Sequence, residues 1–506
     1  MTKYDTQTDE AVLARLGHEQ ELRREFSLLS LTALVSCLMG TWEATTTGLN
    51  VALASGGPPC VFFNFLLCFL STICITLSLG EIASIYPTAG GQYHWVAALS
   101  PTASRAAPAW ATGWISIGGQ LVFGASAAFA AGLQFQGVII MNNDNYVPER
   151  WHGLLLYWAV LVYCAVTNIW GIRILPHTNI AIGVVHIAAF IGVVAVLLAM
   201  SDKTSASSVF VEVQNQSGWD SDALAWLVGL ISAVYPFLGY DAACHLSEEL
   251  PHASRNVPLA MMGAVISNGL TGLVFVLSLL FSATNLGDVL STSTGFPYME
   301  IYLEVTRSHA GATVLALVTP FIGSAASAAS LASTSRTLWA FARDKATPFD
   351  RHLSKVDDKL KVPVHSVVAV LVFQAALGLI YLGSTAALNA ILSMAAIGMY
   401  LSYILPIIYM LVYGRRRHET KRSYRYLRLP DWLGVSLNVV SIVWIVLVII
   451  FSTFPSTMPV TAETMNYSIV VLAGWLVFGV VYYLTYGRHK FEAPVSDVSV
   501  ISATRQ

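Results

Sequence analysis

Long apolar stretches separated by short polar segments follow one another along almost the whole chain. Each is about 20 residues or longer, the length that a helix needs to cross a hydrocarbon layer of about 30 Å. Twelve of these runs are therefore predicted to be membrane-spanning helices. They lie at residues 28–51, 59–84, 109–140, 152–170, 178–200, 223–246, 258–283, 311–341, 364–382, 386–413, 432–453 and 465–486.

The composition supports a membrane protein and argues against several other classes. Of the 506 residues, 55% are hydrophobic and only 11% are charged, whereas soluble domains carry about 25% charged residues. No basic tract is interleaved with aromatic residues, as a nucleic-acid surface would require. The first 26 residues are polar and charged, which predicts that no cleavable signal peptide begins the chain. The six cysteines lie in or beside apolar runs without metal-ligand spacing, so we expect packing roles and no metal site.

The basic residues predict the orientation of the chain in the membrane. With the N-terminus in the cytoplasm, 24 of the 27 lysines and arginines lie on the cytoplasmic side, as the positive-inside rule requires. Both tails are then cytoplasmic, and the plasma membrane is the expected location, with an internal membrane such as the vacuolar one as the alternative. This topology places the sequon at Asn215 outside, where we expect glycosylation, and also the sequon at Asn466, which abuts a span.

Ionisable groups within membrane spans are costly, so each one marks a candidate functional site. Glu43 lies in the first predicted span, His186 in the fifth and Asp241 in the sixth. Glu43 is a candidate to bind a substrate amine or to carry a proton. For Asp241, a helix cap and a direct substrate contact are both open. Several further charged residues near the cytoplasmic surface are read as gate or loop ion pairs, namely Glu81, Glu248, Glu249, Arg255 and Arg343.

The first and sixth spans are both expected to be interrupted in mid-membrane. Residues 40–48 and residues 235–241 mix glycine or proline with β-branched and polar residues that weaken a helix. The two spans are five apart, an odd offset that inverts the topology between two five-span repeats. A matched pair of interrupted helices in inverted repeats indicates the binding site of a transporter, because the freed backbone groups need partners inside a cavity.

Three further segments carry a resemblance to a known family. The second span is followed by Glu81-x5-Pro87-x-Ala89-Gly90-Gly91-x-Tyr93. The sixth contains Phe237-x-Gly239-x-Asp241, followed by Glu248-Glu249 and Arg255-Asn256-Val257-Pro258. The eighth closes with Ser335-Arg336-x-x-Trp339-Ala340-Phe341-Ala342-Arg343-Asp344. With the number of spans, these segments resemble the amino acid–polyamine–organocation superfamily, specifically its fungal amino acid/choline transporter branch, which includes choline and GABA permeases.

The resemblance implies an all-α, leucine-transporter-like fold with about twelve helices and secondary active transport that is usually proton-coupled. It divides the chain into five parts: a cytoplasmic tail (1–27), a first five-helix repeat (28–200), an inverted second repeat (223–413), two additional helices (432–486) and a cytoplasmic tail (487–506). In relatives, a Gly-Ser-Gly-type break in the first span receives the substrate carboxylate. Measured back from residues 56–57, the matching positions here are Trp42, Glu43 and Ala44. A carboxylate there attracts an ammonium and repels a carboxylate.

Two groups of candidate residues follow. His186 lies near a position where some sodium-independent relatives place a lysine that stands in for sodium, and a histidine there would titrate near neutral pH. Aromatic side chains around the two breaks can hold an ammonium by cation–π attraction. The predicted substrate-binding residues are Trp42, Glu43, Ala44, Thr45, Thr46, Tyr235, Phe237, Gly239, Tyr240 and Asp241; the predicted proton-coupling residues are His186 and Glu43.

The sequence thus predicts a proton-coupled permease, without cofactor or metal, for an amine-bearing metabolite such as an amino acid, GABA, choline or a polyamine. An exchanger or exporter of a specialised metabolite is an alternative. A transporter-like nutrient sensor is another, although the tails of about 26 and 20 residues lack the length of a signalling domain. No phosphate loop, nucleophile elbow or metal motif indicates an enzyme or an ATP-driven pump.

Overall fold

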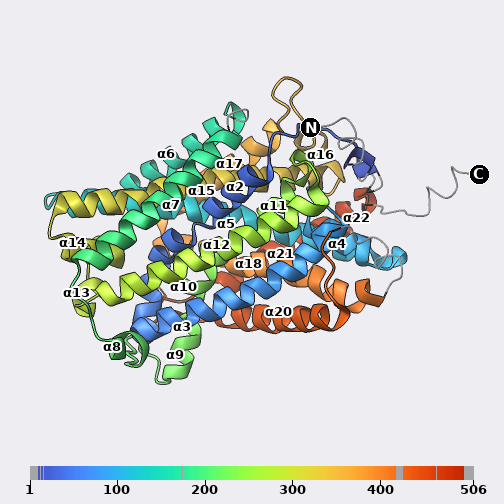
Figure 1. Ribbon diagram of the computed structural model, residues 1–506. Helices are drawn as coiled ribbons and strands as arrows, with labels where there is room; N and C mark the ends of the chain where they lie inside the picture. The colour runs from blue at the N-terminus through green and yellow to red at the C-terminus, as the bar shows by residue number, and fades with distance from the viewer. Residues whose placement is uncertain are drawn as a thin grey trace, which may run out of the picture.

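The protein is a bundle of long helices that run roughly side by side (Figure 1). The computed structural model describes residues 9–11, 13–14, 16, 18–171, 175–416, 426–462 and 464–494. Within these residues there are eleven helical segments long and apolar enough to cross a membrane, and no strand. The all-α fold predicted from the apolar runs is confirmed.

The first of these segments, Leu28–Ile85, is 58 residues long and holds the first two predicted spans. It comprises α2 (Leu28–Met39) and α3 (Thr41–Ile85), and α3 contains one residue with non-helical dihedrals, Gly57 (φ 71°, ψ −162°). A positive φ suits glycine because it has no Cβ, and the two prolines that follow are tolerated where a new helix begins. The chain therefore turns at Gly57, and the eleven segments correspond to the twelve predicted spans.

The remaining helices match the predicted runs closely. The third and eighth runs, which exceed the thickness of a bilayer, become α5 with 37 residues and α15 with 35 residues. The other spanning segments are α6 (Arg150–Ile169), α7 (Leu175–Met200), α9 (Asp222–Val228) with α10 (Leu230–Val234) and α11 (Ala242–His245), α12 (Ala253–Ser282), α17 (Val364–Gly383), α18 (Thr385–Val412), α20 (Asp431–Phe451) and α21 (Ser468–Tyr482). Shorter helices between them are α4 (Gln92–Leu99), α8 (Ala206–Phe210), α13 (Leu286–Leu290), α14 (Pro297–Thr306), α16 (Asp350–Leu353) and α22 (Arg488–Lys490).

The packing of the bundle is that of a protein surrounded by lipid. α5 (Ala106–Asn142) packs against α15 (His309–Arg343) and α18, and α3 packs against α12, so these helices form the centre. The peripheral helices α7, α20 and α21 instead turn large apolar side chains outward; examples are Val184, Val443 and Val470. A soluble protein of this size would not expose so many apolar side chains.

The first and last described segments of the chain, around Gln20 and Glu492, lie at the same end of the bundle, which we call the tail end. Gln20 donates a hydrogen bond to the carbonyl of Glu248, and the amide of Glu492 donates one to the carbonyl of Asp344. Figure 1 shows α4, α16 and α22 at this end, and α8, α13 and α14 at the other, which we call the loop end. An even number of membrane crossings would place both tails on one side, and the described segments near Gln20 and Glu492 lie at one end of the bundle. The division into two inverted repeats remains a prediction.

Candidate functional site

The first helix break lies at Gly40, between α2 and α3. Gly40 has φ 45° and ψ 46°, in the left-handed region that favours glycine. The prediction that Trp42, Glu43 and Ala44 occupy the break itself is corrected here, because these residues form the first turn of α3. The interruption falls at the glycine, since a side chain there would be strained and Trp42 and its neighbours keep helical dihedrals.

Asn268 of α12 satisfies the backbone groups that this break frees. Its Oδ1 accepts a hydrogen bond from the amide of Thr41 at 3.0 Å, and its Nδ2 donates to the carbonyl of Ser36 at 3.2 Å. A helix break inside a membrane requires such internal partners. One buried amide thus stabilises both half-helices of the first span.

The second break lies in the sixth span. A 3₁₀ turn over Tyr235–Phe237 ends in extended backbone at Leu238, and Gly239 has φ 96° before α11 begins at Ala242. The Thr41 hydroxyl donates a hydrogen bond of 2.8 Å to the carbonyl of Pro236. The structure therefore brings the two predicted breaks together, one against the other.

Glu43 and His186 form a buried acid–base pair next to the first break. Glu43 Oε1 lies 2.7 Å from His186 Nδ1, and the side chains are only 4% and 3% exposed. Trp42 packs beside this pair, with its ring 6.0 Å from that of His186 and 5.2 Å from that of Phe275. The two residues predicted separately to couple protons are thus direct partners across 143 positions of sequence.

Glu43 lines a small cavity, and its second carboxylate oxygen is unpaired within the described part of the chain. Oε2 has no hydrogen-bond partner among the described residues, and Glu43 lines a cavity of about 50 Å³ enclosed by α2, α3, α5 and α15. Of the other predicted substrate residues, Ala44 and Tyr235 also line it. An unpaired buried carboxylate oxygen is costly, so a ligand that reached this atom would supply the partner that it lacks.

The small cavity adjoins a larger one that reaches toward the loop end. Thr47, Ala130 and Tyr235 line both, and the larger cavity has a volume of about 610 Å³. Its wall extends along the segment that joins α20 to α21, which includes Phe454 and Asn466. The larger cavity therefore lies between the loop end and the small cavity that Glu43 lines.

Five predicted substrate residues serve the structure around the breaks instead of lining the small cavity. The hydroxyls of Thr45 and Thr46 donate to the carbonyls of Thr41 and Glu43 in their own helix. Phe237 packs among aromatic rings, with Phe69 stacked on it, and Tyr240 packs on Tyr403 at 5.3 Å. At Gly239, an added Cβ would lie 3.1 Å from Leu38. Their role in substrate binding stays a prediction.

Asp241 is held by side chains of other helices. Its carboxylate accepts hydrogen bonds of 2.7 Å from Gln92 Nε2 and from the Tyr403 hydroxyl, and it lies 3.4 Å from His245 Nε2. Although Asp241 immediately precedes α11, its side chain does not cap that helix. The capping interpretation was therefore wrong, because tertiary partners occupy both carboxylate oxygens. His245 also contacts the carbonyl of Ala89 at 2.9 Å.

Ion pairs close the bundle at its tail end, as expected for the acidic residues there. Arg343 donates two hydrogen bonds of 3.1 Å to Glu248, and Arg336 Nε lies 2.8 Å from Glu249 Oε1. These pairs link the segment after α11 to α15. A third pair joins Arg415 to Glu81 at 2.6 Å, and Arg255 lies over the ring of Tyr426.

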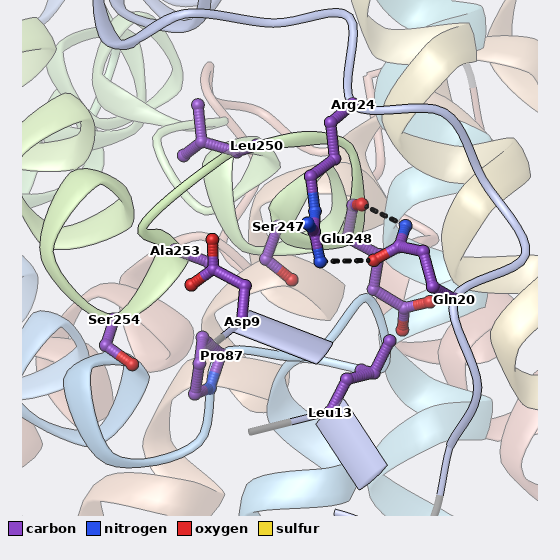
Figure 2. A pocket seen from close by; sticks show the side chains of 10 residues that line it. All are labelled: Asp9, Leu13, Gln20, Arg24, Pro87, Ser247, Glu248, Leu250, Ala253 and Ser254. Atoms are coloured by element: carbon purple, nitrogen blue, oxygen red, sulfur yellow. Dashed lines mark hydrogen bonds between the residues drawn. The ribbon is translucent and has the colours of Figure 1, made fainter. Parts of the chain in front are cut away.

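The N-terminal segment covers this closed end. Figure 2 shows a pocket of about 20 Å³ where Gln20 bonds the carbonyl of Glu248 and accepts a bond from Arg24. Asp9 accepts a hydrogen bond from the amide of His252, and the amide of Phe26 donates to the carbonyl of Glu249. The tail thus binds the backbone of the segment that carries the gate carboxylates.

Neutral amides are the site residues that the sequence reasoning missed. Asn268, Gln92 and Gln134 all lie in the buried centre, at most 2% exposed. Asparagine and glutamine within apolar runs are, like the ionisable side chains there, costly to bury without a partner. Asn268 and Gln134 lie in predicted spans and could have been found in this way, whereas Gln92 lies in the connection between the second and third predicted spans.

The remaining predicted chemistry is placed as follows. Nδ2 of Asn215 donates to the carbonyl of Trp219 and to Asp222; its glycosylation remains a prediction. All six cysteines are unpaired. Within the described residues, no group of three or more histidine, cysteine, aspartate or glutamate side chains is placed to hold a metal ion.

A bundle of membrane-length helices with two apposed breaks around a cavity is typical of a transporter of small molecules. A sequence model described as amino acid permease matches residues 26–475, so the chain belongs to that family. The family is part of the superfamily that the motifs indicate, and the predicted resemblance is confirmed.

Individual relatives align with this chain along most of their length. The chain is 29% identical to a choline transporter of Saccharomyces cerevisiae over 480 residues, covering 94% of this chain and 84% of the relative. It is 32% identical to a putative amino acid/polyamine transporter of Macrophomina phaseolina, covering 85% and 95% respectively. An amino-acid permease of Arabidopsis thaliana is 28% identical, with 96% of both chains covered. The protein is therefore an integral membrane transporter of the amino acid and amine permease class.

Proposed function

We propose that this protein is a proton-coupled uptake transporter for a small amine-bearing metabolite, and that Glu43 and His186 form its coupling centre. The observation that carries the proposal is the pair of contacts at Glu43: this residue lines the small cavity and has one carboxylate oxygen unpaired among the described residues, while its other oxygen contacts His186. A carboxylate in a dry cavity favours an ammonium over a carboxylate as its ligand. The names of the relatives, which include choline and amino acid transporters, are compatible with such a substrate.

The pairing explains how one site can respond to both substrate and proton. While Glu43 is ionised, it can hold the substrate ammonium on Oε2 and a proton on the adjacent imidazole through Oε1. If the proton moves to the carboxylate, the attraction for the ammonium falls, because the charge on the carboxylate is lost. The amine on Oε2 and the proton on the imidazole can thus be bound together, as a symporter requires, and transfer of the proton to the carboxylate would accompany release of the amine.

The arrangement of cavities and ion pairs supports a direction of access. We assign the tail end to the cytoplasm because it carries most of the basic residues. The larger cavity lies beside the small one on the side of the loop end, whereas the ion pairs Arg336–Glu249 and Arg343–Glu248 lie at the tail end. This is the state that would receive a substrate from outside. Breaking these pairs would accompany release to the cytoplasm.

Uptake by cells that lack their own permeases tests the proposal. Labelled choline, 4-aminobutanoate and 1,4-diaminobutane would be supplied over a range of external pH, with and without a protonophore. We expect accumulation of at least one amine, faster at acidic external pH and abolished by the protonophore. His186→Ala should flatten this pH dependence while the protein still reaches the membrane. Efflux or exchange without net accumulation would favour the alternative of an exchanger or exporter.

A further inference from the structure

Besides Glu43, two polar residues that line the small cavity have a buried polar atom without a hydrogen-bond partner in the described chain. Gln134 Nε2 and Thr319 Oγ1 form no hydrogen bond with any described residue, and both residues line the cavity that Glu43 lines. Each is 2% exposed. The Thr319 hydroxyl lies near that of Tyr298 without a hydrogen bond of good geometry. Because buried polar groups in native proteins are nearly always paired, these atoms indicate a ligand.

The two residues come from helices that pack against each other. Gln134 lies on α5 and Thr319 on α15, and the cavity wall that these helices form consists otherwise mainly of small residues. Ala127, Ala130, Ala131, Gly323 and Ala326 are among them. Small residues leave room beside the amide and the hydroxyl, so a ligand atom can approach both.

The charge of the cavity limits what the rest of the ligand can be. Glu43 is the only carboxylate among the lining residues, and no lysine or arginine lines the cavity. A second ammonium or a carboxylate on the ligand would thus be taken out of water without a counter-ion, which is strongly unfavourable. An amide and a hydroxyl can each donate and accept hydrogen bonds, so they suit an uncharged polar group.

We infer that Gln134 and Thr319 form a neutral subsite that binds a hydroxyl or amide group of the substrate, whose single charge is the amine held by Glu43. The inference rests on the proposed function, because it assumes that an amine occupies the cavity. It narrows the substrate class to singly charged amines with an uncharged polar group. Diamines and amino acids with a free carboxylate are then poor ligands.

A matched series of four-carbon amines tests this inference on the purified full-length protein. The probes are 1-aminobutane, 4-aminobutan-1-ol, 1,4-diaminobutane and 4-aminobutanoate, which share the amine and differ only at the other end. Their dissociation constants would be obtained from thermal stabilisation of the protein. One or two neutral hydrogen bonds should make the amino alcohol bind about threefold to tenfold more tightly than 1-aminobutane. The diamine should bind at least about a hundredfold more weakly than the amino alcohol.

Two variants connect the preference to the subsite. Gln134→Leu keeps the approximate size and removes the amide, and Thr319→Val is nearly isosteric and removes the hydroxyl. Either should reduce the advantage of the amino alcohol over 1-aminobutane by about threefold or more. Thr334→Val is the matched control, since the hydroxyl of Thr334 lies on the same helix but already donates to the carbonyl of Ser330 at 2.8 Å. It should leave the advantage unchanged.

The outcomes separate this inference from the proposed function. If the diamine or 4-aminobutanoate binds as tightly as the amino alcohol, or if both variants keep the full advantage, the neutral subsite is wrong while an amine transporter remains. If none of the four amines binds and no labelled amine is transported, the proposed function fails and the inference fails with it.

Discussion

Replacing Glu43 with glutamine removes the charge at the coupling centre and little else. The glutamine amide has nearly the same shape as the carboxylate, and it can either donate to or accept from Nδ1 of His186, which lies 2.7 Å from Glu43 Oε1. The cavity-facing position keeps a polar atom as well. We therefore expect Glu43→Gln to fold and to reach the membrane.

The size of the effect follows from the burial of the pair. The side chain of Glu43 is only 4% exposed, so its attraction for an ammonium is poorly screened by water. Hydrogen bonds to charged groups contribute about 1.5–3 kcal/mol. Loss of this contribution should weaken the binding of an amine substrate by about tenfold to about 150-fold.

Two assays distinguish the possible roles of Glu43. Equilibrium binding of the labelled substrate to purified protein reports the contact of Glu43 with the amine. A comparison of counterflow with concentrative uptake in proteoliposomes reports proton coupling. If Glu43 carries the proton, glutamine imitates the protonated form, so exchange persists and concentrative uptake is lost. Glu212→Gln is the control, because Glu212 is an exposed residue between α8 and α9. Unchanged affinity together with unchanged accumulation in Glu43→Gln would refute the reasoning.

Three further predictions address topology, the gate and the N-terminal segment. A cysteine at position 203 should react with an impermeant reagent from outside and one at position 421, beyond the described residues, only from inside; labelling of both from one side would contradict the orientation. Arg336→Met leaves Glu249 as an unpaired buried charge and should destabilise the closed gate by about 3–5 kcal/mol. The effect would be measured as increased reactivity of a cysteine placed at the tail end. The double variant with Glu249→Gln should recover most of this loss. Burial, assisted by nearby Arg343, lowers the pKa of His18 in the docked N-terminal segment to about 3. In the undocked segment, His18 has the ordinary pKa of about 6.5. The free energy of docking should therefore be constant well above that pH and become less favourable as the pH falls, by about 1.4 kcal/mol between about pH 7.5 and pH 5.5. Limited proteolysis of the segment measures this, and a wild-type pH response retained in His18→Gln would exclude His18 as its source.

The spans could be predicted because the bilayer imposes a length on each apolar run. The run at residues 28–84 shows the one place where helix assignment and crossing differ. There α3 is formally continuous through the end of the first span and the whole of the second, and the turn between them depends on the dihedrals of Gly57, which the following prolines indicate in the sequence. The exact position of the first break was harder to predict. It was inferred by counting back from residues 56–57, whereas Gly40 supplies the left-handed backbone two residues earlier.

The candidate site could be predicted as a set of residues but not as an arrangement. Glu43 and His186 were both selected because each is ionisable within an apolar run, yet their contact depends on how α3 and α7 pack. Asp241 was predicted to cap a helix or bind substrate, since its tertiary partners Gln92 and Tyr403 cannot be inferred from local sequence. Gln134 was not predicted because the search covered ionisable groups in the spans and left out neutral amides, which are also costly to bury without a partner.

The coupling of amine transport to proton movement at Glu43 and His186 is the central claim, and proton flux measures it most directly. Purified protein in liposomes with an internal pH-sensitive dye would be given the labelled amine that cells accumulate, without an imposed pH gradient. We predict that uptake of the amine acidifies the lumen, and that His186→Ala abolishes the acidification while exchange of labelled for unlabelled amine continues. Concentrative uptake without acidification, or unchanged acidification in His186→Ala, would contradict the account.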